Sequence, residues 1–79
     1  MAITKASAAL FLEYAQDACN WNGTPLVGGN VGGSKAERGN LTQLKIAGLI
    51  KTFLDGGETW VEFTDEGKTL AASLGVQIS

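Results

Sequence analysis

The chain has 79 residues, of which 44% are hydrophobic and 18% charged, and its formal net charge is −2. This length suits a single domain, 1–79, and the composition is that of a folded globular protein rather than a disordered one. The negative net charge excludes a protein that binds nucleic acid through its overall charge, and no apolar run is long enough to span a bilayer.

The cysteine and histidine content limits the location and the chemistry. Cys19 is the only cysteine, so it has no disulfide partner within the chain, and we expect a reducing, cytoplasmic location with Cys19 in the core. There is no histidine, and no carboxylates are paired in an apolar setting or spaced like a calcium loop. The sequence therefore predicts no enzyme activity, no cofactor and no metal site.

A first helix is expected from Lys5 to Ala18, with Thr4 as its N-cap. Its predicted core-facing stripe follows the helical spacing and consists of Ala8, Phe11, Leu12, Ala15 and Cys19. Leu10 and Tyr14 fall nearly opposite that stripe. Two interpretations remain open for them: incidental apolar residues on the surface, or a surface for a protein partner or a homodimer.

The segment from Asn20 to Gly33 is expected to be a loop, with Leu26-Val27 as a brief strand. Five glycines between Gly23 and Gly33 leave little room for a well-formed second helix. Residues 28–35 have the glycine spacing of a phosphate-binding loop, but Lys35 is displaced by one position. We therefore expect a connector rather than a nucleotide site.

A second helix is predicted over 34–47. Ser34 and Glu37 form a capping box at its start, and Gly48 ends it. Gly39 inside it costs roughly 1 kcal/mol in helix propensity. A break at Gly39 and a continuous helix both remain open, and we favour the continuous helix.

Two strand-like runs, Leu49–Leu54 and Thr59–Phe63, flank Asp-Gly-Gly-Glu and predict a β-hairpin. Alternation makes Val61 and Phe63 the core pair and leaves Trp60 on the outer face. There, Trp60 is either covered by the N-terminal segment or by residues 76–78, or exposed as an anchor for a partner.

A last helix is expected after the hairpin, capped by Thr64 and closed by Gly75. Asp65 and Glu66 suit the positive end of its dipole. Its predicted buried stripe consists of Leu70, Ala71 and Leu74.

Two motifs in the C-terminal half resemble a known family. Residues 39–50, Gly-Asn-Leu-Thr-Gln-Leu-Lys-Ile-Ala-Gly-Leu-Ile, resemble the end of a winged-helix recognition helix that enters the wing. Residues 63–67, Phe-Thr-Asp-Glu-Gly, resemble the Leu-Thr-x-x-Gly element after the wing in transcriptional regulators of the multiple-antibiotic-resistance (MarR) type. The resemblance implies an α+β winged helix: three helices, a short hairpin wing and a third short strand at Leu26-Val27.

The charges support a DNA-binding interpretation. Between Gly28 and Leu54 four cations stand against Glu37 alone, whereas the rest of the chain has two lysines and seven carboxylates. On a helical wheel, Leu41, Leu44 and Ala47 form the core side of the second helix, with a basic face opposite that also receives Ile46. The predicted DNA contacts are Lys35, Arg38, Gly39, Thr42, Gln43 and Lys45 on this helix and Lys51, Thr52 and Thr59 on the wing.

The sequence thus predicts a small transcriptional regulator that binds double-stranded DNA. It inserts the helix 34–47 into the major groove and lays the wing 49–63 on the backbone. The alternative is an acidic protein-interaction module that uses the same scaffold without DNA, since fold alone does not decide function. Leu10, Tyr14 and Trp60 are the candidate partner surface in that case.

Overall fold

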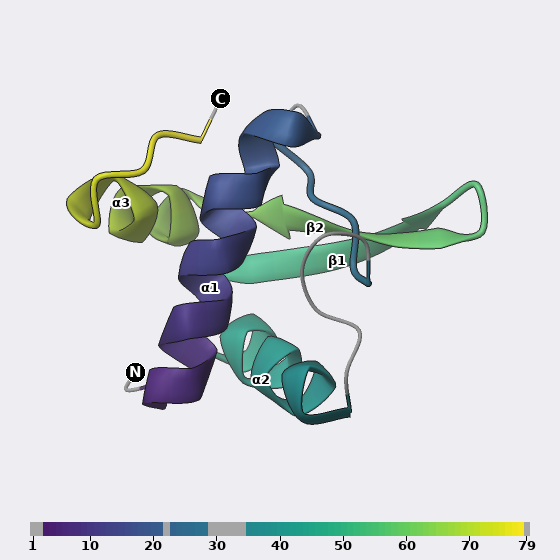
Figure 1. The fold of residues 1–79 in the computed structure, drawn as a ribbon, viewed down its shortest axis with the longest axis horizontal. Helices are drawn as coiled ribbons and strands as arrows, with labels where there is room; N and C mark the ends of the chain where they lie inside the picture. The colour runs from purple at the N-terminus through teal and green to yellow at the C-terminus, as the bar shows by residue number, and fades with distance from the viewer. Residues whose placement is uncertain (1–2, 22, 29–34, 79) are drawn as a thin grey trace.

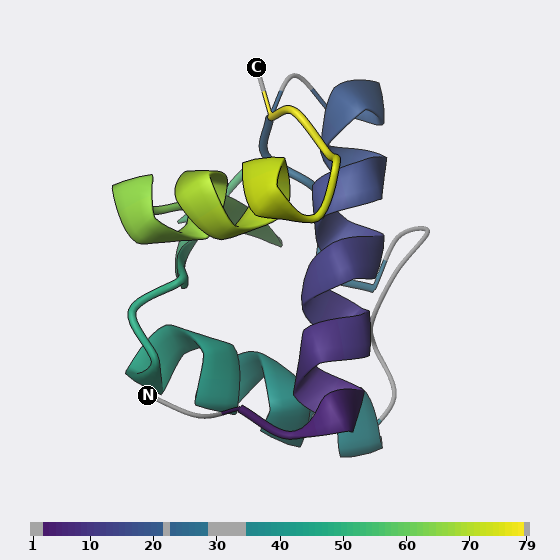
Figure 2. The same ribbon diagram turned by 90° about the vertical axis from the view of Figure 1, so that its left-hand side faces the viewer.

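The computed structural model describes residues 3–21, 23–28 and 35–78, with the side chains of residues 35–37 also left undescribed. Its described part is an α+β fold with three α-helices and a two-stranded antiparallel hairpin. Figure 1 shows the hairpin extending away from the helices, and Figure 2 shows α3 near the C-terminal end of α1 and α2 near its N-terminal end, both running roughly across the direction of α1. This arrangement is compatible with the expected winged helix.

Helix α1 (Lys5–Asp17) is followed by the 3₁₀ turn η1 (Ala18–Asn20). Thr4 is the N-cap as expected, because its Oγ1 accepts a hydrogen bond from the backbone N–H of Ser7 at 3.1 Å. The predicted buried face of this helix is confirmed at Phe11 and Ala15 and wrong at Ala8, Leu12 and Cys19. Its buried positions are Ser7, Leu10, Phe11, Tyr14, Ala15 and Asp17, so the stripe is rotated relative to the expected one.

The physical reason for the rotation lies at the contact between α1 and α2. Ser7 is buried there and donates its hydroxyl to Oδ1 of Asn40 at 3.3 Å, so a small polar residue occupies a core position. Leu10 and Tyr14, 3% and 1% exposed, therefore belong to the core and form no partner surface. Cys19 lies in η1 and is exposed, contrary to the expectation of a buried thiol.

In the loop after η1, the structure has an isolated bridge to the hairpin where the short strand was expected. Leu26 forms an isolated antiparallel bridge with Trp60, supported by hydrogen bonds from Val27 N to Thr59 O and from Val61 N to Pro25 O. No helix occurs within the described residues 23–28 of this loop. The glycine-rich segment 29–34, including the Ser34 half of the predicted capping box, lies outside the described residues.

Helix α2 (Lys35–Ile46) is continuous, so the break at Gly39 does not occur. Gly48 ends the helix with φ of 77°, and the N–H of Leu49 donates to the carbonyl of Leu44. This bond closes a Schellman-type cap, which glycine favours because only it adopts positive φ at little cost.

Strands β1 (Ile50–Asp55) and β2 (Glu58–Phe63) pair from Ile50 opposite Phe63 to Asp55 opposite Glu58. Each strand is thus longer at the turn than predicted, and only Gly56 and Gly57 remain in the loop. Their φ angles of 61° and 82° fit a type I′ turn, whose twist suits a two-residue hairpin.

Helix α3 (Asp65–Ser73) begins at the expected cap, Thr64, whose Oγ1 accepts from the N–H of Gly67 at 3.1 Å. The same hydroxyl donates to the carbonyl of Gly48, which ties α3 to the end of α2. The predicted stripe of α3 is only partly buried. Ala71 is fully buried and Leu70 half-buried, whereas Leu74 is 50% exposed.

The core lies between α1, α2 and one face of the hairpin. Val61 and Phe63 face into it as predicted, and the ring of Phe63 meets Phe11 edge-on at 5.7 Å between centroids. The buried hydrophobic residues are Leu10, Phe11, Tyr14, Ala15, Ala18, Leu41, Leu44, Ile50, Val61, Phe63 and Ala71. This core fixes which sides of α2 and of the hairpin remain exposed.

Candidate functional site

Helix α2 presents polar and basic residues on the side opposite the core. Leu41 and Leu44 are buried, whereas Arg38, Thr42 and Lys45 are exposed. Gly39 and Ile46 are exposed as well. Lys35 begins the helix, and its side chain lies outside what the structure describes. We call Arg38, Gly39, Thr42 and Lys45 the α2 basic face.

Gln43 does not belong to the α2 basic face. Its Oε1 accepts a hydrogen bond from the backbone N–H of Thr4 at 2.9 Å, and its side chain is half-buried. This bond joins α2 to the segment that precedes α1. The sequence-predicted DNA contact at Gln43 is therefore replaced in the structure by a contact within the protein.

A cleft of about 440 Å³ separates the α2 basic face from the hairpin turn. Arg38, Thr42 and Lys45 line one wall, and Thr59 lines the other. The cleft is completed by Val27, Gly28, Leu41, Gly57 and Glu58. It thus combines two cations with one carboxylate at its outer edge.

The three DNA contacts predicted on the hairpin do not all lie on the same face of it. Thr52 and Thr59 alternate in step with Ile50 and Val61, so they lie on the face of the hairpin whose inner end joins the core. Lys51 lies on the other face, directly opposite Glu62 in the register. The register therefore places the two threonines on one face of the hairpin and Lys51 on the other, and Thr59 shares the cleft with α2.

Lys51 instead lines a hollow of about 380 Å³ near the start of α3. The charged residues around this hollow are Lys51, Glu62, Asp65, Glu66 and Lys68. Three carboxylates thus surround two ammonium groups. An anionic ligand gains little at such a surface, because neighbouring carboxylates repel it.

Trp60 is half-buried on the outer face of the hairpin, and its neighbour differs from the expected ones. The ring against it is that of Trp21, from the loop after α1, at 5.5 Å between centroids and an interplanar angle of 66°. Sequence reasoning assigned Trp21 no such place. Phe53, opposite Trp60 in the register, was also missed, although a two-residue turn at Gly56-Gly57 suffices to pair them.

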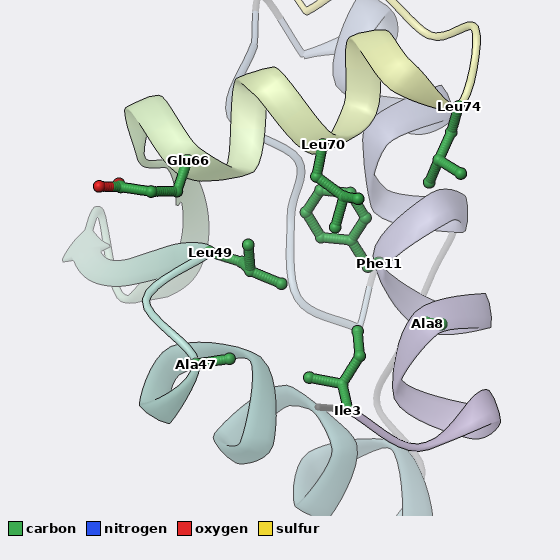
Figure 3. Close-up of a pocket in the computed structure, with 8 residues that line it drawn as sticks. All are labelled: Ile3, Ala8, Phe11, Ala47, Leu49, Glu66, Leu70 and Leu74. Carbon is green, nitrogen blue, oxygen red and sulfur yellow. The ribbon is translucent and has the colours of Figure 1, made fainter. Parts of the chain in front are cut away.

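An apolar cavity of about 520 Å³ lies between α1, α3 and the end of α2 (Figure 3). Its lining consists of Ile3, Ala8, Phe11, Ala47, Leu49, Glu66, Leu70 and Leu74. Figure 3 shows the apolar side chains pointing toward one another, with the Glu66 carboxylate directed away from them. None of the sequence-predicted site residues lines this cavity, which only the packing of three helices creates.

The structure describes the ranges 3–21, 23–28 and 35–78. Within them, no group of three or more His, Cys, Asp and Glu side chains could hold a metal ion. In the same ranges, no helix has the length and apolar character to cross a membrane. Comparison of the chain with protein-family models, curated proteins and solved structures finds no match. A functional assignment must therefore come from the surfaces described above.

Proposed function

We propose that the protein is a winged-helix DNA-binding protein that acts as a small transcriptional regulator. In this proposal α2 enters the major groove and the hairpin acts as the wing against the neighbouring backbone. The observation that carries the proposal is the α2 basic face, which is exposed on one side of a helix beside the hairpin. The major groove of B-DNA is wide enough to admit an α-helix that presents such a face.

The residues of the α2 basic face have distinct roles in this interface. Arg38 and Lys45 provide the positive charge for phosphates or for the O6 and N7 acceptors of guanine. Thr42 donates its hydroxyl to the carbonyl of Arg38 at 3.1 Å, so it offers DNA its methyl group and the acceptor side of Oγ1. That methyl group suits contact with the methyl group of thymine.

Gly39 and the hairpin threonines complete the proposed interface. A Cβ atom added at Gly39 would meet nothing within 4 Å, so packing within the protein does not require glycine there. Its absent side chain lets the α2 backbone approach DNA closely. Lys35 adds charge at the start of α2, and Thr52 and Thr59 can contact phosphates from the wing. We leave Lys51 and Gln43 out of this interface, because Lys51 lies on the outer face of the hairpin and Oε1 of Gln43 accepts a hydrogen bond from Thr4.

The test is binding of a fluorescently labelled random-sequence duplex, followed by anisotropy across a salt series. We expect measurable affinity at low salt and a slope of about −3 in log K against log salt if three phosphates are contacted. Replacing Arg38→Ala and Lys45→Ala together should weaken binding by about tenfold or more and make the slope shallower by about 1 to 2.

Lys68→Ala is the matched control, because it also removes one exposed positive charge but lies on α3. It should leave the affinity within about twofold, since long-range charge effects are weak when screened. Equal losses for Lys68→Ala and for Lys45→Ala alone would show that only net charge matters. Absence of binding at low salt would favour the protein-interaction alternative.

A further inference from the structure

The outer face of the hairpin is both aromatic and acidic. Strand alternation and the register place six side chains on it, in the facing pairs Lys51 with Glu62, Phe53 with Trp60, and Asp55 with Glu58. Three of these are carboxylates and one is an ammonium group. This face therefore has the opposite charge to the α2 basic face.

Three aromatic rings gather at the centre of this face. Phe53 and Trp60 are directly opposite across the strands, which brings their Cβ atoms within cross-strand contact range. Trp21 packs edge-on against Trp60 at 5.5 Å. Phe53 is 37% exposed, and both tryptophans are half-buried, so solvent reaches part of the cluster.

Both indole N–H groups are already engaged within the protein. Trp21 Nε1 donates to Oδ2 of the buried Asp17 at 2.8 Å, and Trp60 Nε1 donates to the carbonyl oxygen of Asp55 at 3.1 Å. These bonds hold the rings in place and leave no indole donor for a ligand. What remains accessible is ring surface, whose negative quadrupole attracts cations.

A hollow of about 330 Å³ opens among these rings and is lined by Asn20, Trp21, Thr24, Phe53, Asp55 and Trp60. Aromatic surface and a carboxylate together attract an ammonium or guanidinium group, the first through its π face and the second through its charge. Pockets that hold small molecules bury most of the ligand, whereas this hollow lies open on the face of a hairpin. It is suited to the tip of a side chain presented by a larger molecule.

We propose that this outer face docks a basic segment of a partner protein, with one arginine or lysine side chain inserted between Phe53, Trp21 and Trp60. Asp55 pairs with the inserted cation. Glu58 and Glu62, on either side along β2, attract further cations of the same segment. DNA is excluded as the occupant because the carboxylates repel phosphate. This docking site is on the opposite face of the hairpin from Thr59 of the proposed DNA interface, and Glu58 is the residue that borders both.

The test is a titration of the ¹⁵N-labelled full chain with the peptide acetyl-Gly-Arg-Gly-Arg-Gly-amide, followed through the two indole N–H resonances. We expect both resonances to shift and to saturate at millimolar peptide. Phe53→Ala should weaken the affinity by about fivefold through loss of a cation–π contact. Leu54→Ala is the matched control, because Leu54 is the next residue, 78% exposed, and on the other face.

Three results would overturn the proposal. The first is the absence of saturation up to about 10 mM peptide, the range of very weak binding. The second is an equal loss of affinity in Phe53→Ala and Leu54→Ala, with the spectra of both variants showing a folded chain. The third is tighter binding of tetramethylammonium chloride than of the peptide, which would make the hollow a site for a free organic cation.

Discussion

Gly39 and Gly67 both occupy positions within α-helices, but the space around them differs. At Gly67 an added Cβ atom would overlap the backbone carbonyl oxygen of Leu49, which cannot move aside as a side chain does. At Gly39 an added Cβ atom would meet nothing. The glycine of the Phe-Thr-Asp-Glu-Gly motif is therefore required by the fold, since it lets the first turn of α3 touch the end of α2.

Replacing Gly67→Ala should destabilise the protein by about 2 kcal/mol or more, as overpacking against fixed backbone does. The hydrogen bond from Thr64 N to Leu49 O, 3.2 Å long, would be disturbed at the same place. Urea denaturation followed by circular dichroism measures the change. An unchanged midpoint would mean that α3 can shift away from Leu49 at little cost.

Replacing Gly39→Ala should have the opposite effect on stability and raise it by about 1 kcal/mol, the helix-propensity difference between the two residues. DNA affinity should fall in the same variant if the α2 backbone approaches the major groove at this residue. The two measurements together separate a structural role from a binding role. A variant that is more stable and binds DNA as tightly as the parent would remove Gly39 from the proposed interface.

At the scale of elements, local rules identified most of the fold, because each acts within a few residues. The cap at Thr64, the stop at Gly48 and the hairpin at Gly56-Gly57 each depend on a single hydrogen bond or on one or two glycines with positive φ. The α+β character was predicted from the same local patterns, and at Leu26-Val27, where a brief strand was expected, the structure has an isolated bridge. The exposed position of Arg38 followed from the helical period alone.

The rotation of α1 shows why the rest was not predictable from local patterns. The helix carries apolar residues on more than one side, and its partner decides which side is buried. Ser7 is in the core, where its hydroxyl donates to Asn40, 33 positions later, a partner that no local pattern of α1 indicates. The engagement of Gln43 with Thr4, the Trp21–Trp60 contact and the apolar cavity likewise depend on residues distant in sequence.

The burial of α1 can be tested by comparing Leu10→Ala with Leu12→Ala. Leu10 is 3% exposed, so Leu10→Ala should lower the free energy of unfolding by about 2 to 4 kcal/mol through lost burial and a cavity. Leu12 is half-buried, so Leu12→Ala should lower it by about 1 kcal/mol. Chemical denaturation of both variants gives the order directly. If Leu12→Ala were the more damaging, the originally expected stripe would be the buried one.

At the scale of the whole molecule, the net charge is −2, but positive and negative side chains are concentrated on different surfaces. Arg38 and Lys45 border the cleft beside α2, and the acidic residues of the hairpin gather on its outer face. Because the Debye length at physiological salt is about 8 Å, each surface acts on its ligands largely through its own charges. A protein with a negative net charge can therefore still present a cationic surface to phosphate.

Glu58 lies where these two surfaces meet. It borders the cleft of the α2 basic face, and in the register it also belongs to the acidic outer face. Neutralising it with Glu58→Gln should therefore change the two affinities in opposite directions. DNA should bind about two- to fivefold more tightly, and the arginine peptide more weakly by a similar factor, as expected for exposed charge pairs.

Glu66→Gln is the control for Glu58→Gln, because it makes the same charge change on α3, where Glu66 is also exposed. It should alter neither affinity by more than about a factor of 1.5, since the intervening solvent screens it. Both effects of Glu58→Gln should shrink as salt rises, because exposed charges are screened. If Glu58→Gln moved both affinities in the same direction, a change in the hairpin itself, rather than charge on two separate surfaces, would be the cause.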